Sequence, residues 1–102
     1  MDEQEMMAVL EEASVEIDQA SWVSDRPSEI EVHQSADFFV GTTETGWHFH
    51  LAAYEVPSLM GAPRRGYTGT AMKKSTIIKL PSELAKKACL MAEQAITKGV
   101  PS

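Results

Sequence analysis

The sequence predicts a single α+β domain, in which an antiparallel sheet packs one face against an N-terminal and a C-terminal helix. Near both ends of the chain, apolar residues recur at the three- and four-residue spacing of an amphipathic helix. Between these ends lie β-prone segments in which apolar and polar residues alternate. At 102 residues the chain can bury one core but not two. The predicted order is α-β-β-β-(loop)-β-α, over residues 1–102.

The first predicted element is a helix over residues 3–21. Pro27 prevents a longer helix, because its ring has no N–H to donate and clashes with the preceding turn. Trp22 and Val23 are expected to fold under the end of the helix as part of the core. The apolar stripe that predicts this helix consists of Met6, Val9, Leu10, Ala13, Ile17 and Ala20.

Three strands are expected next. Polar and apolar residues alternate strictly over residues 29–33, and residues 38–43 are β-prone. A turn at residues 44–46 then leads into a strand over residues 47–54. The alternation in this third strand predicts two opposite faces, one with Trp47, Phe49 and Leu51 and the other with His48, His50 and Ala52.

Residues 57–72 are predicted to form a long loop rich in glycine, proline and arginine. A fourth strand is expected over residues 75–80. The C-terminal helix is then expected to begin at Ser82, as its N-cap, and to stop at Gly99.

The charge of the chain is distributed unevenly. Residues 1–61 contain thirteen carboxylates and one base, whereas residues 62–102 contain eight bases and two carboxylates. The net charge of −6 therefore combines an acidic half with a basic half. Either the two halves neutralise each other, within one chain or head to tail between copies, or each faces a partner of opposite charge.

The sequence contains no glycine-flanked nucleophile, no phosphate-binding loop and no dinucleotide fingerprint. Cys89 is expected to be a buried apolar residue of the last helix. His48 and His50 share a strand face, but a zinc site would need His33 or Glu31 as a third ligand, and a structural role on the wetter sheet face is favoured. We therefore predict no enzyme, no catalytic residue, no metal and no cofactor.

The basic half contains a candidate nucleic-acid surface, with Arg64, Arg65, Lys73, Lys74 and Lys79 for phosphates and Tyr67 for stacking on a base. The run from Lys74 to Lys87 resembles the opening strand and first helix of ribbon-helix-helix repressors. That resemblance implies a strand that pairs across a dimer and reads the major groove through alternate residues among Thr76, Ile78 and Lys79. The element order is also similar to that of double-stranded-RNA-binding domains, with Lys86 and Lys87 on the last helix.

The acidic half supports the preferred hypothesis, a protein that blocks or regulates a larger protein or ribonucleoprotein complex. Its carboxylates would occupy a basic groove that otherwise holds nucleic acid. In composition the chain resembles phage-encoded antagonists of host defence, anti-CRISPR proteins included. The predicted partner-binding residues are Glu11, Glu12, Glu16, Asp18, Arg64, Arg65 and Tyr67.

The acidic N-terminus is unlike a basic targeting segment, and no apolar run approaches the length of a membrane span. These observations predict a cytoplasmic protein. An exposed sheet edge would allow a homo-oligomer. Tyr54, Met60 and Met72 are candidate surface anchors.

Overall fold

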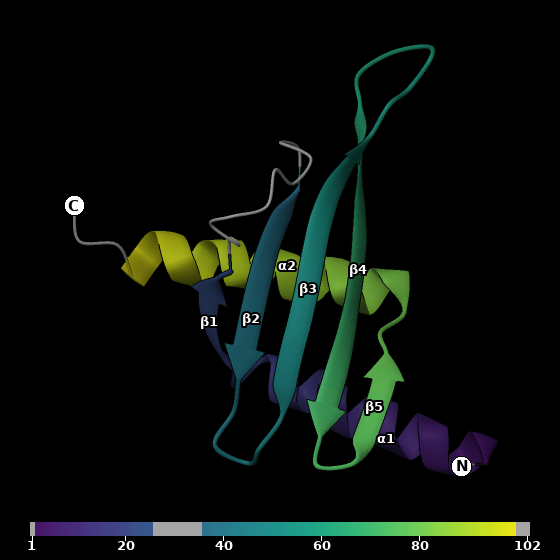
Figure 1. Cartoon of the computed structure of the whole chain (residues 1–102), viewed down its shortest axis with the longest axis vertical. Coiled ribbons are helices and arrows are strands. Elements are labelled where there is room, and N and C mark those ends of the chain that lie inside the picture. Colours follow the sequence, from purple (N-terminus) through teal and green to yellow (C-terminus); the bar gives the residue numbers. More distant parts are fainter. Residues whose placement is uncertain (1, 26–35, 100–102) are drawn as a thin grey trace.

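A computed structural model describes residues 2–25 and 36–99 and has the predicted α+β architecture. Five strands form one antiparallel meander in the order β1-β2-β3-β4-β5. Figure 1 shows both helices behind this sheet, so they cover one face, and we call the opposite face the outer face. The elements are α1 (Glu3–Ile17), β1 (Ser21–Ser24), β2 (Asp37–Thr42), β3 (His48–Val56), β4 (Arg64–Lys73), β5 (Thr76–Lys79) and α2 (Ser82–Gly99).

The first helix begins after an N-cap residue, Asp2, and ends earlier than predicted. The Asp2 carboxylate accepts a hydrogen bond of 2.8 Å from the backbone N–H of Glu5, which satisfies one of the free amides of the first turn. α1 ends at Ile17, because residues 21–24 pair with β2 as the edge strand β1. Trp22 lies in the core as predicted, but the prediction for Val23 is wrong: Val23 is exposed, because successive side chains of a strand point to opposite faces. The strand predicted over residues 29–33 lies outside the described residues.

The core lies between the sheet and the helices, and its two sides differ in side-chain size. The sheet contributes large residues, among them Trp47 and Phe49, whose rings stack 6.1 Å apart. In contrast, α2 contributes the small, fully buried residues Ala85, Ala88, Cys89 and Ala92, which let the helix lie close to the sheet. The predicted alternation in β3 is confirmed, because Trp47, Phe49 and Leu51 are buried whereas His48 and His50 are exposed.

The long loop predicted over residues 57–72 is wrong in its second half. Only residues 57–63 connect the strands, and residues 64–73 form β4. The glycines of this stretch lie in the strand, where each leaves room for a neighbouring side chain. A Cβ atom at Gly66 would meet the ring of Tyr54 at 2.4 Å, and one at Gly69 would meet Leu51 at 2.4 Å. These glycines therefore serve cross-strand packing.

The hairpin of β3 and β4 extends beyond the strands on either side of it. Its pairing runs from His48↔Met72 to Val56↔Arg64. β2 pairs with β3 only as far as Ala53, and β5 pairs with β4 only from Thr70. Residues 54–68 thus project as a two-stranded arm, which rises above the rest of the sheet in Figure 1.

Candidate partner-binding surfaces

Most of the predicted partner-binding carboxylates of α1 contact other parts of the same chain. Glu12 accepts hydrogen bonds from Lys73 at 3.0 Å and from the Trp47 indole N–H at 3.2 Å. The Lys73 hydrogen bond, followed by that from Trp47, lowers the pKa of Glu12 below its ordinary value. Asp18 pairs with Lys87 at 3.3 Å. The acidic and basic halves of the sequence therefore neutralise each other at these points, within one chain.

Arg65 and Tyr67 are held in the same way. The Arg65 guanidinium donates to Glu93 at 2.6 Å and to Asp37 at 3.5 Å, and the Glu93 hydrogen bond raises its pKa. The guanidinium also lies over the Tyr67 ring, 5.6 Å from its centroid, while this ring packs against the core. Both side chains therefore have contacts within the same chain.

The predicted phosphate-binding cations that stay unpaired among the described residues are not gathered into one patch. Arg64 lies at the start of β4 in the arm, whereas Lys74 lies in the turn at the other end of that strand. Lys79 ends β5, opposite Thr70. Lys73, the remaining predicted phosphate ligand, is turned toward Glu12 and the Trp47 ring. The predicted basic surface over residues 64–79 is therefore split into separate charges.

The strand implied by the ribbon-helix-helix resemblance is also occupied. β5 pairs with β4 of its own chain, and Ile78 is only 3% exposed. Because its side chain belongs to the core, Ile78 cannot read a DNA groove. Ile77, on the opposite face of β5, is exposed instead.

The histidine pair lies on the outer face, where the described residues supply no third ligand. His48 is flanked by Thr42 and Met72, and His50 by Val40 and Thr70. Within residues 2–25 and 36–99, no group of three or more potential ligands is placed to hold a metal ion. The candidate ligands His33 and Glu31 lie outside this part of the chain.

Cys89 is fully buried in α2, as predicted for an apolar residue. Desolvation, with a smaller contribution from the Glu93 carboxylate, raises the pKa of this thiol to about 11. A buried thiol of high pKa is a poor nucleophile at neutral pH.

This burial predicts a pH dependence of stability. The thiol of the unfolded chain ionises near pH 8.5, whereas that of the folded chain ionises near 11. The stabilisation that comes from keeping the thiol protonated is therefore complete below about pH 8.5. It is lost as the pH rises toward 11, by about 3 kcal/mol. The contribution of the thiol is isolated by measuring the free energy of unfolding in urea, from pH 7 to 11, for the wild type and for Cys89→Ala. If this free energy changes with pH equally in both proteins, the prediction is refuted.

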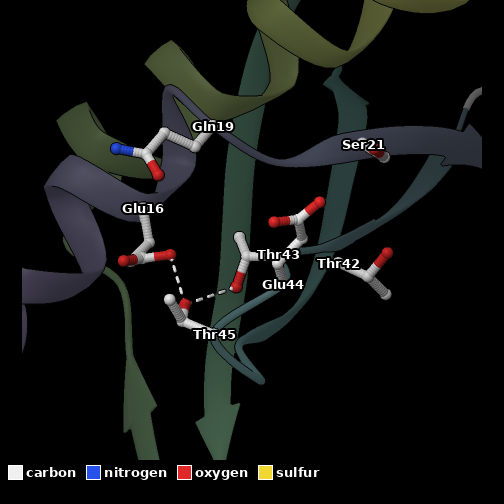
Figure 2. Close-up of a pocket in the computed structure, with 7 residues that line it drawn as sticks. All are labelled: Glu16, Gln19, Ser21, Thr42, Thr43, Glu44 and Thr45. Carbon is white, nitrogen blue, oxygen red and sulfur yellow. Dashed lines mark hydrogen bonds between the residues drawn. The ribbon is translucent and has the colours of Figure 1, made fainter.

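A polar pocket of about 360 Å³ lies where α1 meets the turn between β2 and β3. In Figure 2, Glu16 of α1 and Thr45 of this turn point toward one another. Thr45 donates to Glu16 and shares a hydrogen bond of 2.9 Å with Thr43, whose hydroxyl accepts from the backbone N–H of Trp47. These contacts tie the helix to the turn. Glu16, a predicted partner-binding residue, thus has a structural contact.

Two surfaces contain exposed side chains that form no hydrogen bond or ion pair with other described residues. At the tip of the arm, Leu59 and Met60 are fully exposed. Of the anchors predicted from sequence, Met60 is confirmed as exposed, Tyr54 is partly exposed and Met72 is half-buried. Leu59 was missed, although a Leu-Met pair between Pro57 and Gly61 is a signal for an apolar hairpin tip.

The second surface is the N-terminal half of α1 together with its N-cap. Residues Asp2 to Ala8 are all exposed. In Figure 1 this end of the helix extends past the edge strand β5. Glu3, Glu5 and Glu11 form no ion pair with any described residue. Met6 and Met7 lie exposed among them.

The part of the chain that the structure describes contains no helix long and apolar enough to cross a membrane. No protein-family model, no curated protein and no solved structure matches the chain.

Proposed function

We propose that the protein is a non-enzymatic cytoplasmic binding module that blocks or regulates a larger protein or ribonucleoprotein complex by occupying one of its surfaces. The tip of the arm is the observation that supports this function most strongly. Leu59 and Met60 are adjacent, large, apolar and fully exposed. Burial of such side chains by a partner lowers the free energy of the complex. Because the two paired strands of the arm hold the tip, less conformational entropy is lost on binding.

The acidic half of α1 supports a partner with a basic surface. The carboxylates of Glu3, Glu5 and Glu11 are exposed and unpaired among the described residues, so they attract cationic side chains over a distance. A surface that normally holds nucleic acid has this chemistry. This is the basis for proposing a phage-encoded inhibitor of a nucleic-acid-handling defence complex, of the anti-CRISPR kind.

The placement of the two surfaces supports a partner that is at least as long as the protein itself. Figure 1 is drawn with the longest axis vertical, and the arm lies at one end of that axis while α1 lies at the other. The molecule extends 40 Å along this axis. A partner that contacts both surfaces must therefore present a face of similar length.

The test is capture of partners from a lysate of the native host, with and without nuclease, followed by affinity measurement with the purified partner. We expect the double variant Leu59→Ser/Met60→Ser to lower the affinity by about tenfold or more. We expect the triple variant Glu3→Lys/Glu5→Lys/Glu11→Lys to associate more slowly, and added salt should no longer lower its association rate. Both variants should fold normally, because these side chains make no core contacts.

Val23→Ser is the matched control, because it also removes an exposed apolar side chain but lies on the edge strand β1, away from both surfaces. Its affinity should equal that of the wild type. An unchanged affinity of the Leu59/Met60 variant would overturn the proposal. Recovery of nucleic acid, with every captured protein lost on nuclease treatment, would overturn it in favour of the nucleic-acid alternative.

A further inference from the structure

The outer edge of β4 is unpaired along the arm. Its pairing with β5 ends at Thr70↔Lys79, and one further hydrogen bond joins the Leu80 N–H to the Gly69 carbonyl at 2.9 Å. From Arg64 to Thr68, β4 has β3 on one side and no strand among the described residues on the other. Five residues of β4 therefore have an unpaired edge on the same side as β5, beyond the point where β5 pairing ends.

The backbone groups that face this open edge can be identified. The Gly69 carbonyl points toward β5, since it accepts the Leu80 hydrogen bond. Along a strand, the N–H and C=O groups of successive residues point alternately to the two sides. Tyr67 and Arg65 therefore direct their N–H and C=O groups outward, whereas Gly66 and Thr68 direct theirs toward β3. No hydrogen bond to those outward groups is found among the described residues.

We propose that this edge, Arg64 to Thr68, is a strand-addition site for an extended, carboxylate-bearing segment of the partner protein. The inference rests on the proposed binding function and deepens it by naming how the partner is held. An added strand would continue the line of β5 and bond to the outward groups of Arg65 and Tyr67. Main-chain hydrogen bonds supply affinity in such a complex, and alternate side chains supply specificity.

Charge selects an acidic segment over a second copy of this edge. Residues 64–68 contain two arginines and no carboxylate, so the same segment from another copy offers no complementary charge. Arg65 is already paired with Glu93 on the helix side of the sheet. By alternation Arg64 lies on the outer-face side, unpaired among the described residues. A carboxylate on the outer-face side of the added strand would meet it.

The experiment uses a displayed library of random twelve-residue peptides selected on the full-length protein. We expect the selected peptides to carry Asp or Glu at one position of an alternating pattern. Binding should protect the amides of Arg65 and Tyr67 from hydrogen exchange, whereas Gly66 and Thr68 should be protected already in the free protein. Protection confined to other residues, or a selection that yields no binder, would overturn the inference.

A matched pair of variants tests the edge itself. Arg65→Pro and Arg65→Ala both remove the Arg65 side chain and its ion pairs, but only proline removes the outward N–H. We expect Arg65→Pro to bind a selected peptide about tenfold more weakly than Arg65→Ala. Equal affinities of the two variants would overturn the inference.

Modified peptides give the same test without a protein variant. One peptide is N-methylated at its odd-numbered amides and a second at its even-numbered amides. Binding should be abolished in the peptide whose methylated amides face β4 and kept in the other. Equal effects of the two modifications would overturn the inference. Self-association of the protein that Arg65→Pro abolishes, without peptide binding, would replace the partner segment with a second copy. Because these assays use no native partner, their failure leaves the Leu59/Met60 test intact, and the converse also holds.

Discussion

Replacing Trp47 by alanine is expected to lower the free energy of unfolding by about 3–5 kcal/mol. Trp47 is 1% exposed and stacks on Phe49. Its indole N–H donates to Glu12, and the Lys73 ammonium lies 5.6 Å from its ring. One side chain thus connects β3, α1 and β4. Domains of this size have total stabilities of about 5–15 kcal/mol, so the variant should be partly unfolded at 37 °C.

Trp47→Phe is the control that separates packing from hydrogen bonding. It keeps an aromatic ring against Phe49 but removes the N–H that Glu12 accepts, so a smaller loss of about 1–2 kcal/mol is expected. Urea unfolding followed by far-ultraviolet circular dichroism measures both variants. Equal losses for alanine and phenylalanine would show that the hydrogen bond, and not the buried ring, accounts for the stabilisation.

The elements that could be predicted from sequence are those whose own residues carry a repeating pattern. The two helices show apolar stripes, and β3 alternates over its first four residues, so the buried and exposed faces of that part follow from the chain alone. β1 is only four residues long and too short to show a period. Its strand conformation comes from pairing with β2, which is a tertiary contact.

β4 shows why local composition misleads. Gly66 and Gly69 normally indicate turns, and here they indicate close packing, because Tyr54 and Leu51 of β3 fill the space above them. Only knowledge of the neighbouring strand distinguishes the two meanings. The same error concealed the arm and its open edge, since both exist only once residues 64–68 are a strand.

For the candidate sites, too, features of one segment could be predicted from sequence, whereas contacts between distant segments could not. Sequence reveals that one half of the chain is acidic and the other basic, but not which charges meet. Glu12 and Lys73 lie 61 residues apart and still form an ion pair. The predicted partner-binding set therefore mixed side chains with structural contacts, such as Glu12 and Arg65, with side chains that are unpaired among the described residues, such as Glu11 and Arg64.

Gly41→Ala is the second substitution with a large expected effect, although it adds only one methyl group. A Cβ atom at Gly41 would meet the ring of Trp22 at 2.5 Å. That ring is buried and lies 5.8 Å from the Phe49 ring, so it cannot move away without disturbing the core. The expected loss is about 1–3 kcal/mol, as for other overpacked cores. Urea unfolding measures it.

Gly66→Ala provides the matched control, because it places the same methyl group at 2.4 Å from the ring of Tyr54. Tyr54 is 39% exposed on the arm, so its ring can turn into solvent. Replacing glycine also reduces the freedom of the unfolded chain, which stabilises the fold by about 0.4–1 kcal/mol and offsets the contact. Gly66→Ala should therefore stay within about 0.5 kcal/mol of the wild type. Equal losses in the free energy of unfolding at the two positions would mean that β1 does not hold Trp22 rigidly in the core. The edge strand would then move to accommodate the methyl group as readily as the arm does.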